Sequence, residues 1–232
     1  MKISVIIPCF NEHQTIVDVL DKVLEINSSK YNLEMIIVDD YSTDGSREIL
    51  NNISKDKIQH LILNEKNYGK GYSIRQGIKK ASGEIILIQD ADLEYDPHDY
   101  EKLLKPILNG NADIVYGSRF IGSDSKRVLY FWHSVGNYFL TFLSNMFSNL
   151  NLSDMECGYK VFKSKIIKNI ELNENRFGFE PEITAKISSL DIKIYEVGIN
   201  YHGRKYSEGK KITWKDGFSA LRCIVRYNLP SK

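Results

Sequence analysis

The chain is poor in cysteine: Cys9, Cys157 and Cys223 are scattered over 232 residues, and no two of them form a CxxC pair. An odd, scattered set of thiols argues against a zinc site and against a disulfide framework, and it fits a reducing cytoplasm. The chain also lacks an excess of charge of one sign, because its net charge is +1. Without a basic field we expect no nucleic-acid partner.

Long apolar runs are absent as well. No uninterrupted apolar stretch approaches the ~20 residues that a membrane-spanning helix needs. The first apolar run, residues 3–7, is ended by Pro8 and Asn11 too early for a signal peptide.

Apolar residues nevertheless make up 42% of the chain, enough for the core of a single domain over residues 1–232. Short apolar runs alternate with stretches of helical periodicity, which is typical of βαβ units. The sequence therefore predicts an α/β fold with a single open, mostly parallel sheet flanked by helices. Strands are expected at 3–7, 33–38, 58–63, 85–88, 114–116 and 192–197.

The most informative stretch is residues 85–88, an apolar run followed by Asp90, Asp92 and Glu94. The run predicts a strand buried on both faces of a parallel sheet, with the acids at its carboxyl end, where open α/β sheets hold their ligands. In an extended stretch these carboxylates would share one face. Crowded carboxylates raise each other's pKa, and Mg²⁺ or Mn²⁺ relieves that penalty. A metal site is predicted here; a solvated acidic turn is the alternative.

Glycine-rich phosphate loops are missing too. A dinucleotide-binding fold needs G-x-G-x-x-G after its first strand, whereas residues 8–12 contain no glycine. The segment 67–71 lacks the Walker spacing. Asp39 and Asp40 still end the second strand, where an acid can hydrogen-bond a ribose or a base edge. A turn or a helix cap is an equally good interpretation of this pair.

Six motifs in this order resemble glycosyltransferase family 2, and within it the polyprenyl-phosphate sugar synthases of the dolichol-phosphate mannose synthase type. The motifs occupy residues 5–12, 36–45, 67–71, 90–94, 116–119 and 154–160. The resemblance covers nearly the whole chain and implies the A-type glycosyltransferase fold. It implies an inverting, metal-dependent enzyme that moves a sugar from a GDP- or UDP-linked donor to dolichyl or undecaprenyl phosphate.

The resemblance also implies roles for residues at matching positions. The residues implied in nucleotide-sugar binding are Pro8, Phe10, Glu12, Asp39, Asp40, Lys70, Asp90, Ala91, Arg204 and Lys211. Those implied at the metal are Asp90, Asp92 and Glu94, the last often a glutamine in similar lipid-phosphate enzymes. Ser118 and Arg119 would hold the acceptor phosphate. The implied catalytic residues are Asp92, Arg119 and Asp154.

Two basic features have alternative interpretations. Arg119 follows a strand on the ligand side, which favours an anion clamp over an ordinary surface arginine. The segment from His202 to Lys215 is rich in lysine and arginine and contains Gly203 and Gly209. It can close over a diphosphate or remain a solvated charge run.

Aromatic residues crowd the predicted helical stretch 126–150. It is too polar to span a bilayer, but aromatics beside Lys126 and Arg127 suit a membrane interface. Packing on the core, or on a partner subunit in a homo-oligomer, is the equal alternative. We accordingly expect a nucleotide-sugar-binding half at 1–120 and a smaller acceptor-side half at 121–232, with interfacial helices and the basic closing loop. The expected location is cytoplasmic, peripheral on the inner face of the membrane.

Other functions remain as alternatives. A family 2 transferase that glycosylates a saccharide hydroxyl needs a general base, and Asp154 could serve as one. A phosphate monoester is mostly a dianion at neutral pH and attacks without a base. A catalytically silent sugar-nucleotide-binding subunit is disfavoured by the intact acids at both strand ends. A sugar nucleotidyltransferase is disfavoured because the first loop lacks the glycine-rich motif that such enzymes carry.

Overall fold

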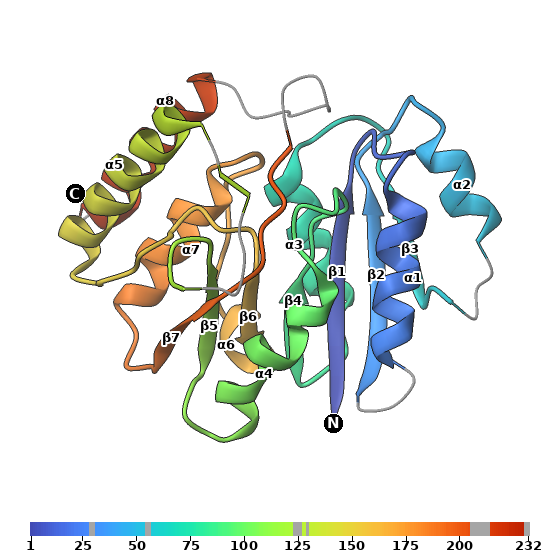
Figure 1. The fold of residues 1–232 in the computed structure, drawn as a ribbon, viewed down its shortest axis with the longest axis horizontal. Coiled ribbons are helices and arrows are strands. Elements are labelled where there is room, and N and C mark those ends of the chain that lie inside the picture. The colour runs from blue at the N-terminus through green and yellow to red at the C-terminus, as the bar shows by residue number, and fades with distance from the viewer. Residues whose placement is uncertain (28–30, 54–56, 123–126, 129, 205–213, 230–232) are drawn as a thin grey trace.

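The computed structural model describes residues 1–27, 31–53, 57–122, 127–128, 130–204 and 214–229. Within these residues seven strands form one sheet, in the order β3-β2-β1-β4-β6-β5-β7 (Figure 1). Their bounds are β1 Lys2–Cys9, β2 Asn32–Asp39, β3 His60–Leu63, β4 Ile85–Ile88, β5 Ile114–Ser118, β6 Lys160–Lys163 and β7 Ile194–Gly198. All pairings are parallel except those of β6. The predicted open, mostly parallel sheet is confirmed.

Strand β6 was not predicted from the sequence. Only Val161 and Phe162 are apolar among its four residues, too few for a period of two to be recognised. It lies antiparallel between β4 and β5. The expectation that β4 has only parallel neighbours is therefore wrong on one side, although residues 85–88 are buried as expected. Because β6 runs backwards, the loop that leads into it reaches the edge where the parallel strands end.

Helices cover both faces of the sheet (Figure 1). Their bounds are α1 Ile16–Asn27, α2 Ser46–Asn52, α3 Lys70–Lys80, the 3₁₀ helix η1 Pro97–Asp99, α4 Tyr100–Leu108, α5 Phe131–Ser148, α6 Ser164–Ile167, α7 Phe179–Ser188 and α8 Trp214–Asn228. Successive strand side chains point to opposite faces. Ile3, Val5 and Ile7 pack in one core with α1 and α4, whereas Ile6 packs in a second core with α3, α7 and α8.

Helix α5 buries polar residues and exposes aromatic ones. Its buried residues are Thr141, Ser144 and Ser148, which are small and polar. Its aromatic rings face outwards, and Phe131 and Trp132 are 70% and 78% exposed. The core-packing alternative is therefore wrong for these rings, and a membrane or a partner subunit remains to cover them. No helix in the described part of the chain is long and apolar enough to cross a membrane.

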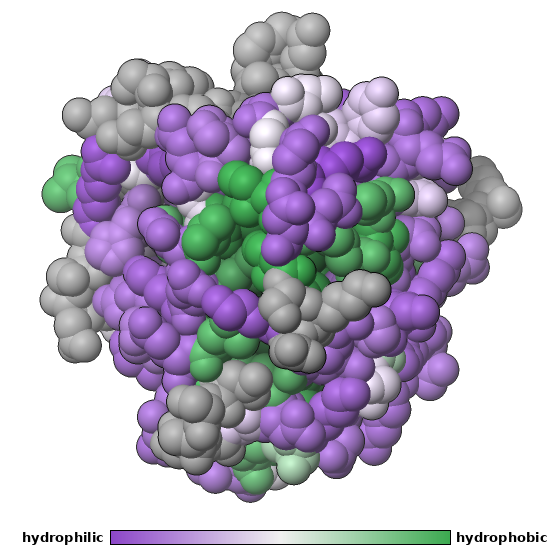
Figure 2. Space-filling view, turned by 90° about the vertical axis from the view of Figure 1, so that its right-hand side faces the viewer, coloured by the Kyte–Doolittle hydropathy of each residue, from purple (hydrophilic) through white to green (hydrophobic). Residues whose placement is uncertain are grey.

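The end of the molecule at α2 and β3 differs from the α5 end. Figure 2 views the end at α2 and β3 and shows mainly hydrophilic residues around a central apolar area. Helices α5 and α8 lie side by side at the other end of the sheet (Figure 1). The exposed aromatic rings of α5 are thus far from the β3 edge.

Candidate active site

A cavity of about 990 Å³ opens where the parallel strands end. Its wall is built from the loops after β1, β2, β3, β4, β5 and β7, from the loop before β6, and from residues of α3, α5, α7 and α8. Of the predicted site residues, those that line it are Pro8, Phe10, Glu12, Asp40, Lys70, Asp90, Ala91, Asp92, Glu94, Arg119 and Arg204. Asp39, Ser118 and Asp154 do not line it, and Lys211 lies outside the described residues. Most of the predicted residues thus lie together where the parallel strands end, which is where open α/β sheets bind their ligands.

The acidic stretch after β4 is a turn, not the extended segment that we expected. Leu93 adopts a left-handed φ of 58°, and the Glu94 backbone N–H donates to Asp92 Oδ1 at 3.1 Å. Thr15 Oγ1 anchors the turn from α1's side by donating to the Ala91 carbonyl at 2.8 Å. The carboxylates therefore do not share a strand face. Asp92 and Glu94 are instead gathered around one cation.

That cation is Arg204, whose guanidinium lies among three carboxylates. It donates to Glu12 Oε2 at 2.9 Å and to Asp92 Oδ2 at 3.0 Å, and its Nε is 3.6 Å from Glu94 Oε1. Tyr201 Oη donates to the other oxygen of Glu94 at 2.8 Å. Burial, with the charges of Glu94 and Asp90, raises the pKa of Asp92 to about 7, and Arg204 offsets these effects only in part. Negative charge is in excess at this end of the cavity.

Lys70 supplies the second cation, at the start of α3. Its Nζ lies 2.8 Å from Asp90 Oδ1 and 3.1 Å from Glu180 Oε1. Burial alone would lower the pKa of Lys70, but these two carboxylates raise it well above its usual value. Gly158 makes the approach possible, because a Cβ at this position would lie 2.2 Å from Asp90 Oδ2. Asp90 is thus held by α3 on one side and by the loop before β6 on the other.

The donor set of this acidic cluster fits a hard divalent cation. Its ligands are all carboxylate oxygens, which Mg²⁺ and Mn²⁺ prefer, and the raised pKa of Asp92 reports uncompensated charge. Among the described residues no three acidic, histidine or cysteine side chains stand at metal-ligand spacing. Lys70 and Arg204 hold the carboxylates in this arrangement, so metal binding requires them to rearrange.

The two acids after β2 have different surroundings. Asp40 lines the cavity and accepts hydrogen bonds from Asn64 Nδ2 at 2.8 Å and from the backbone N–H groups of Tyr68 and Gly69 at 2.9 and 2.6 Å. It therefore shapes the loop before α3 as well as the cavity wall. Asp39 is fully buried away from the cavity and pairs with Arg47 Nε at 2.6 Å. For Asp39 the structure favours the turn interpretation.

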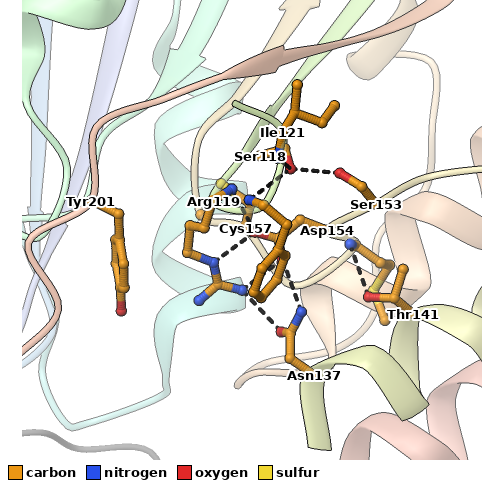
Figure 3. Close-up of polar contacts among 12 residues, drawn as sticks. Ser118, Arg119, Ile121, Asn137, Thr141, Ser153, Asp154, Cys157 and Tyr201 are labelled. Atoms are coloured by element: carbon orange, nitrogen blue, oxygen red, sulfur yellow. Dashed lines mark hydrogen bonds and ion pairs between the residues drawn. The ribbon is translucent and has the colours of Figure 1, made fainter. Parts of the chain in front are cut away.

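Arg119, which follows β5, and Asp154, which lies before β6, form a buried pair (Figure 3). Arg119 Nε and a terminal guanidinium nitrogen each donate to Asp154 at 2.6 Å, and its backbone N–H donates at 3.0 Å. Asn137 of α5 also donates to Asp154, at 3.1 Å. Burial would lower the pKa of Arg119, but Asp154 raises it well above the usual value. Asp154 sits behind Arg119 and positions it, and to act as a base it would have to leave this pair.

Ser118 is also placed away from the cavity. Its Oγ lies 2.5 Å from Ser153 Oγ and accepts from the backbone N–H groups of Phe120 and Ile121 at 3.2 Å (Figure 3). It closes the turn after β5. A direct contact between Ser118 and an acceptor phosphate would require this turn to open.

Two acids in the cavity wall were not among the predicted site residues. Glu156 precedes β6, and Glu180 lies in the first turn of α7. Glu180, Glu182 and Thr184 are polar residues on a helix that is buried on nearly all sides, so in the structure they stand out. Periodicity measured by hydropathy alone cannot separate such a helix from a surface helix.

A doubly wound sheet with an acid-lined cavity at its strand ends defines the class of nucleotide-binding α/β proteins. Within that class, a family model described as glycosyl transferase family 2 matches residues 4–171. The chain belongs to this family, and the predicted resemblance is confirmed.

Named relatives agree with this assignment, and a solved structure shares the fold. A dolichyl-phosphate beta-glucosyltransferase of Trichomonas vaginalis is 31% identical over 86% of this chain and 65% of its own length. A dolichol-phosphate mannosyltransferase of Pyrococcus furiosus is 28% identical over 97% of this chain and 63% of its own length. The chain thus spans just under two thirds of each. Glucosyl-3-phosphoglycerate synthase from Mycobacterium tuberculosis, solved with Mn²⁺, UDP and phosphoglyceric acid, shares the fold with a TM-score of 0.75 at 18% identity, covering 99% of this chain and 80% of that one.

Proposed function

We propose that this protein transfers a sugar from a GDP- or UDP-linked donor to a polyprenyl phosphate, with inversion at the anomeric carbon and with a divalent metal. The observation that carries the proposal is the position of Trp132. This residue lines the cavity and is also 78% exposed, at the start of the outward aromatic face of α5. The cavity therefore opens onto an apolar surface, as an acceptor with a charged head and a hydrocarbon tail requires. Both named relatives act on dolichyl phosphates by name.

The donor occupies the half of the cavity under β1 and β2 in this proposal. Pro8 and Phe10 offer apolar contact to a base, and Asp40 fixes the loop beneath it. The diphosphate lies towards Arg204, which is already ordered by Glu12 and Asp92. A basic side chain at this position neutralises part of the charge that grows on the leaving group.

The metal would be held by Asp90, Asp92 and Glu94, whose oxygens fit it. When bound, it supplies Lewis-acid stabilisation of the departing diphosphate. A donor diphosphate brings two more negative charges to a cluster that already contains four carboxylates, Glu12 included. Arg204 and Lys70 together cannot balance that sum, which is why we propose metal dependence.

Arg119 receives the acceptor phosphate in this proposal. It lines the cavity, and Asp154 and Asn137 hold its guanidinium in one orientation. The second pKa of a phosphate monoester is near 6, so the acceptor attacks as a dianion and needs no proton removed. Such an attack on the side opposite the diphosphate inverts the anomeric carbon.

The test is a transfer assay with labelled sugar nucleotides and Mn²⁺, offered either undecaprenyl phosphate or soluble saccharides. We expect product only with the lipid phosphate, and a large loss with Arg119→Gln. Arg226→Gln is the matched control, because Arg226 is an exposed arginine of α8 outside the cavity. Transfer to saccharides alone would refute the acceptor assignment.

The apolar face of α5 gives a second readout of the same proposal. Membrane association at this face would present the cavity mouth to lipid-borne acceptors. A protein that turns over short-chain and long-chain polyprenyl phosphates equally well, with and without vesicles, would argue that a partner subunit covers α5 instead.

A further inference from the structure

Among the residues that the structure describes, two buried carboxylate oxygens in the cavity wall have no hydrogen-bond partner: Glu156 Oε1 and Glu180 Oε2. Glu180 is only 3% exposed, so water from the bulk cannot easily replace a partner. Buried polar atoms in folded proteins are almost always hydrogen-bonded, so each exception needs an explanation, and at a cavity a bound ligand is one. These two oxygens therefore point to a hydrogen-bond donor that enters the cavity.

The cations that border this part of the cavity are already engaged. Lys70 bridges Asp90 and the other oxygen of Glu180. Lys160 donates to the backbone carbonyls of Met155 and Cys157. Arg119 is paired with Asp154, as described above. These three described cations are therefore not available to the two oxygens, and we look for the missing partner in a bound ligand.

The charge around Glu156 supports the same view. Burial and the charge of Glu180 raise the pKa of Glu156 to about 8, and Lys160 and Arg119 offset only part of their effect. An anionic group brought to these carboxylates would meet repulsion and would find no free donor. A neutral group rich in hydroxyls would supply donors without adding charge.

The location identifies that neutral group. Glu180 is joined through Lys70 to Asp90, the first acid of the cluster expected to hold the donor diphosphate. The sugar of a nucleoside diphosphate sugar is attached directly to that diphosphate. It is therefore the hydroxyl-rich group that reaches Glu156 and Glu180 first.

We propose that Glu156 Oε1 and Glu180 Oε2 form the seat of the transferred sugar, accept hydrogen bonds from its hydroxyls, and restrict the donor to sugars without a carboxylate. This inference rests on the proposed function and names the substrate class of the same cavity. Uronic acid donors are disfavoured because their carboxylate adds negative charge beside two carboxyl groups.

Calorimetric titration of the whole protein with Mn²⁺ present tests the seat. The ligands are UDP, UDP-glucose, UDP-galactose and UDP-glucuronic acid, together with GDP and GDP-mannose. In the unaltered protein at least one neutral sugar should add affinity over its bare nucleotide, and the uronic acid donor should add none. Glu156→Ala should reduce that neutral sugar's affinity about tenfold, as the loss of a buried hydrogen bond that leaves its partner unsatisfied does. The bare nucleotide should bind within about twofold of the unaltered protein.

Further variants separate charge from hydrogen bonding. Glu156→Gln keeps an acceptor and cannot ionise, so at a pH above 8 it should narrow the difference in affinity between neutral and uronic acid donors. Glu180→Ala should act like Glu156→Ala, but it also removes a partner of Lys70, so Glu156 carries the decisive comparison. Glu171→Gln is the control, because Glu171 is an exposed glutamate outside the cavity wall.

Two results overturn the seat: an uronic acid donor that binds as tightly as the neutral sugars, or a Glu156→Ala protein that loses bare nucleotide as much as sugar nucleotide. A protein that binds no nucleoside diphosphate at all would overturn the proposed function, and this inference with it. In the first two results the unaltered protein still binds nucleotide, so the two kinds of failure are distinguishable.

Discussion

Replacement of Asp154 by asparagine tests whether this acid positions Arg119 or acts as a base. The carboxylate is fully buried and receives three hydrogen bonds from Arg119 and one from Asn137. An asparagine there would turn an amide N–H₂ towards guanidinium donors and leave the arginine without a counter-charge. Removing one partner of a buried ion pair costs about 3–5 kcal/mol. That is a large share of the ~5–15 kcal/mol that stabilises a typical protein.

Urea unfolding followed by circular dichroism measures this cost. With an m-value of about 3 kcal/mol/M, the midpoint should fall by roughly 1–2 M. Arg119→Leu should cost a similar amount, and the double variant Arg119→Leu with Asp154→Leu should be more stable than either single change, because no unpaired charge remains. Activity should fall in all three because Arg119 is displaced or absent.

The reasoning fails if Asp154→Asn unfolds within about 0.5 kcal/mol of the unaltered protein. A stable Asp154→Asn protein whose rate collapses with a changed pH profile would identify Asp154 as a general base, worth about 10²–10⁴-fold. The acceptor would then be a saccharide hydroxyl.

Four further predictions follow from the site and its surroundings. Asp92→Ala should fold normally and lose on the order of a thousandfold in rate, and excess chelator should abolish the activity of the unaltered protein; full activity in chelator would contradict this. Asp40→Ala should weaken nucleotide binding by about 1.5–3 kcal/mol in calorimetry, since three hydrogen bonds to its carboxylate shape the loop before α3; unchanged affinity would reduce Asp40 to a turn residue. Flotation with anionic vesicles should recover the protein, and serine at Phe131 and Trp132 should release it; a dimer that dissociates on the same change would point to a partner subunit. Burial alone would raise the pKa of Glu34, but hydrogen bonds from Lys2, Ser4 and Ser82 hold it at about 2, against 4.5 in the unfolded chain. The stabilisation by ionised Glu34 is therefore present above pH 4.5 and is lost as the pH falls towards 2. The free energy of unfolding of Glu34→Gln should decline less steeply over this range, and parallel curves for the two proteins would contradict this.

The sheet could be predicted because its strands carry a strong local signal. Residues 85–88 are apolar throughout, and a run buried on both faces is recognisable without knowledge of its neighbours. Strand β6 has two apolar residues between lysines, and Lys160 is fully buried only because it donates to nearby carbonyls. Its position in the sheet depends on contacts with β4 and β5 that no local pattern encodes.

The site could be predicted where residues follow parallel strands and not elsewhere. The acids after β2 and β4 were found by that rule, but the turn at Leu93 and the gathering of carboxylates around Arg204 depend on contacts across 110 residues. Glu156 lies before an antiparallel strand and not after a parallel one, so a search for residues that follow parallel strands does not find it. The sequestration of Asp154 by Arg119 likewise becomes visible only when both are placed in space.

Because β6 lies between β4 and β5, the surroundings of the acidic cluster depend on a segment that comes much later in the chain. Residues 85–88 pair with 160–163, so β4 and β5 each keep an open edge until the later segment has been synthesised. Open strand edges are prone to pair with other chains. Gly158, which packs against Asp90, arrives with the same segment. Residues 1–120 by themselves therefore lack the strand between β4 and β5, and the cavity has this wall only when residues 158–163 are in place.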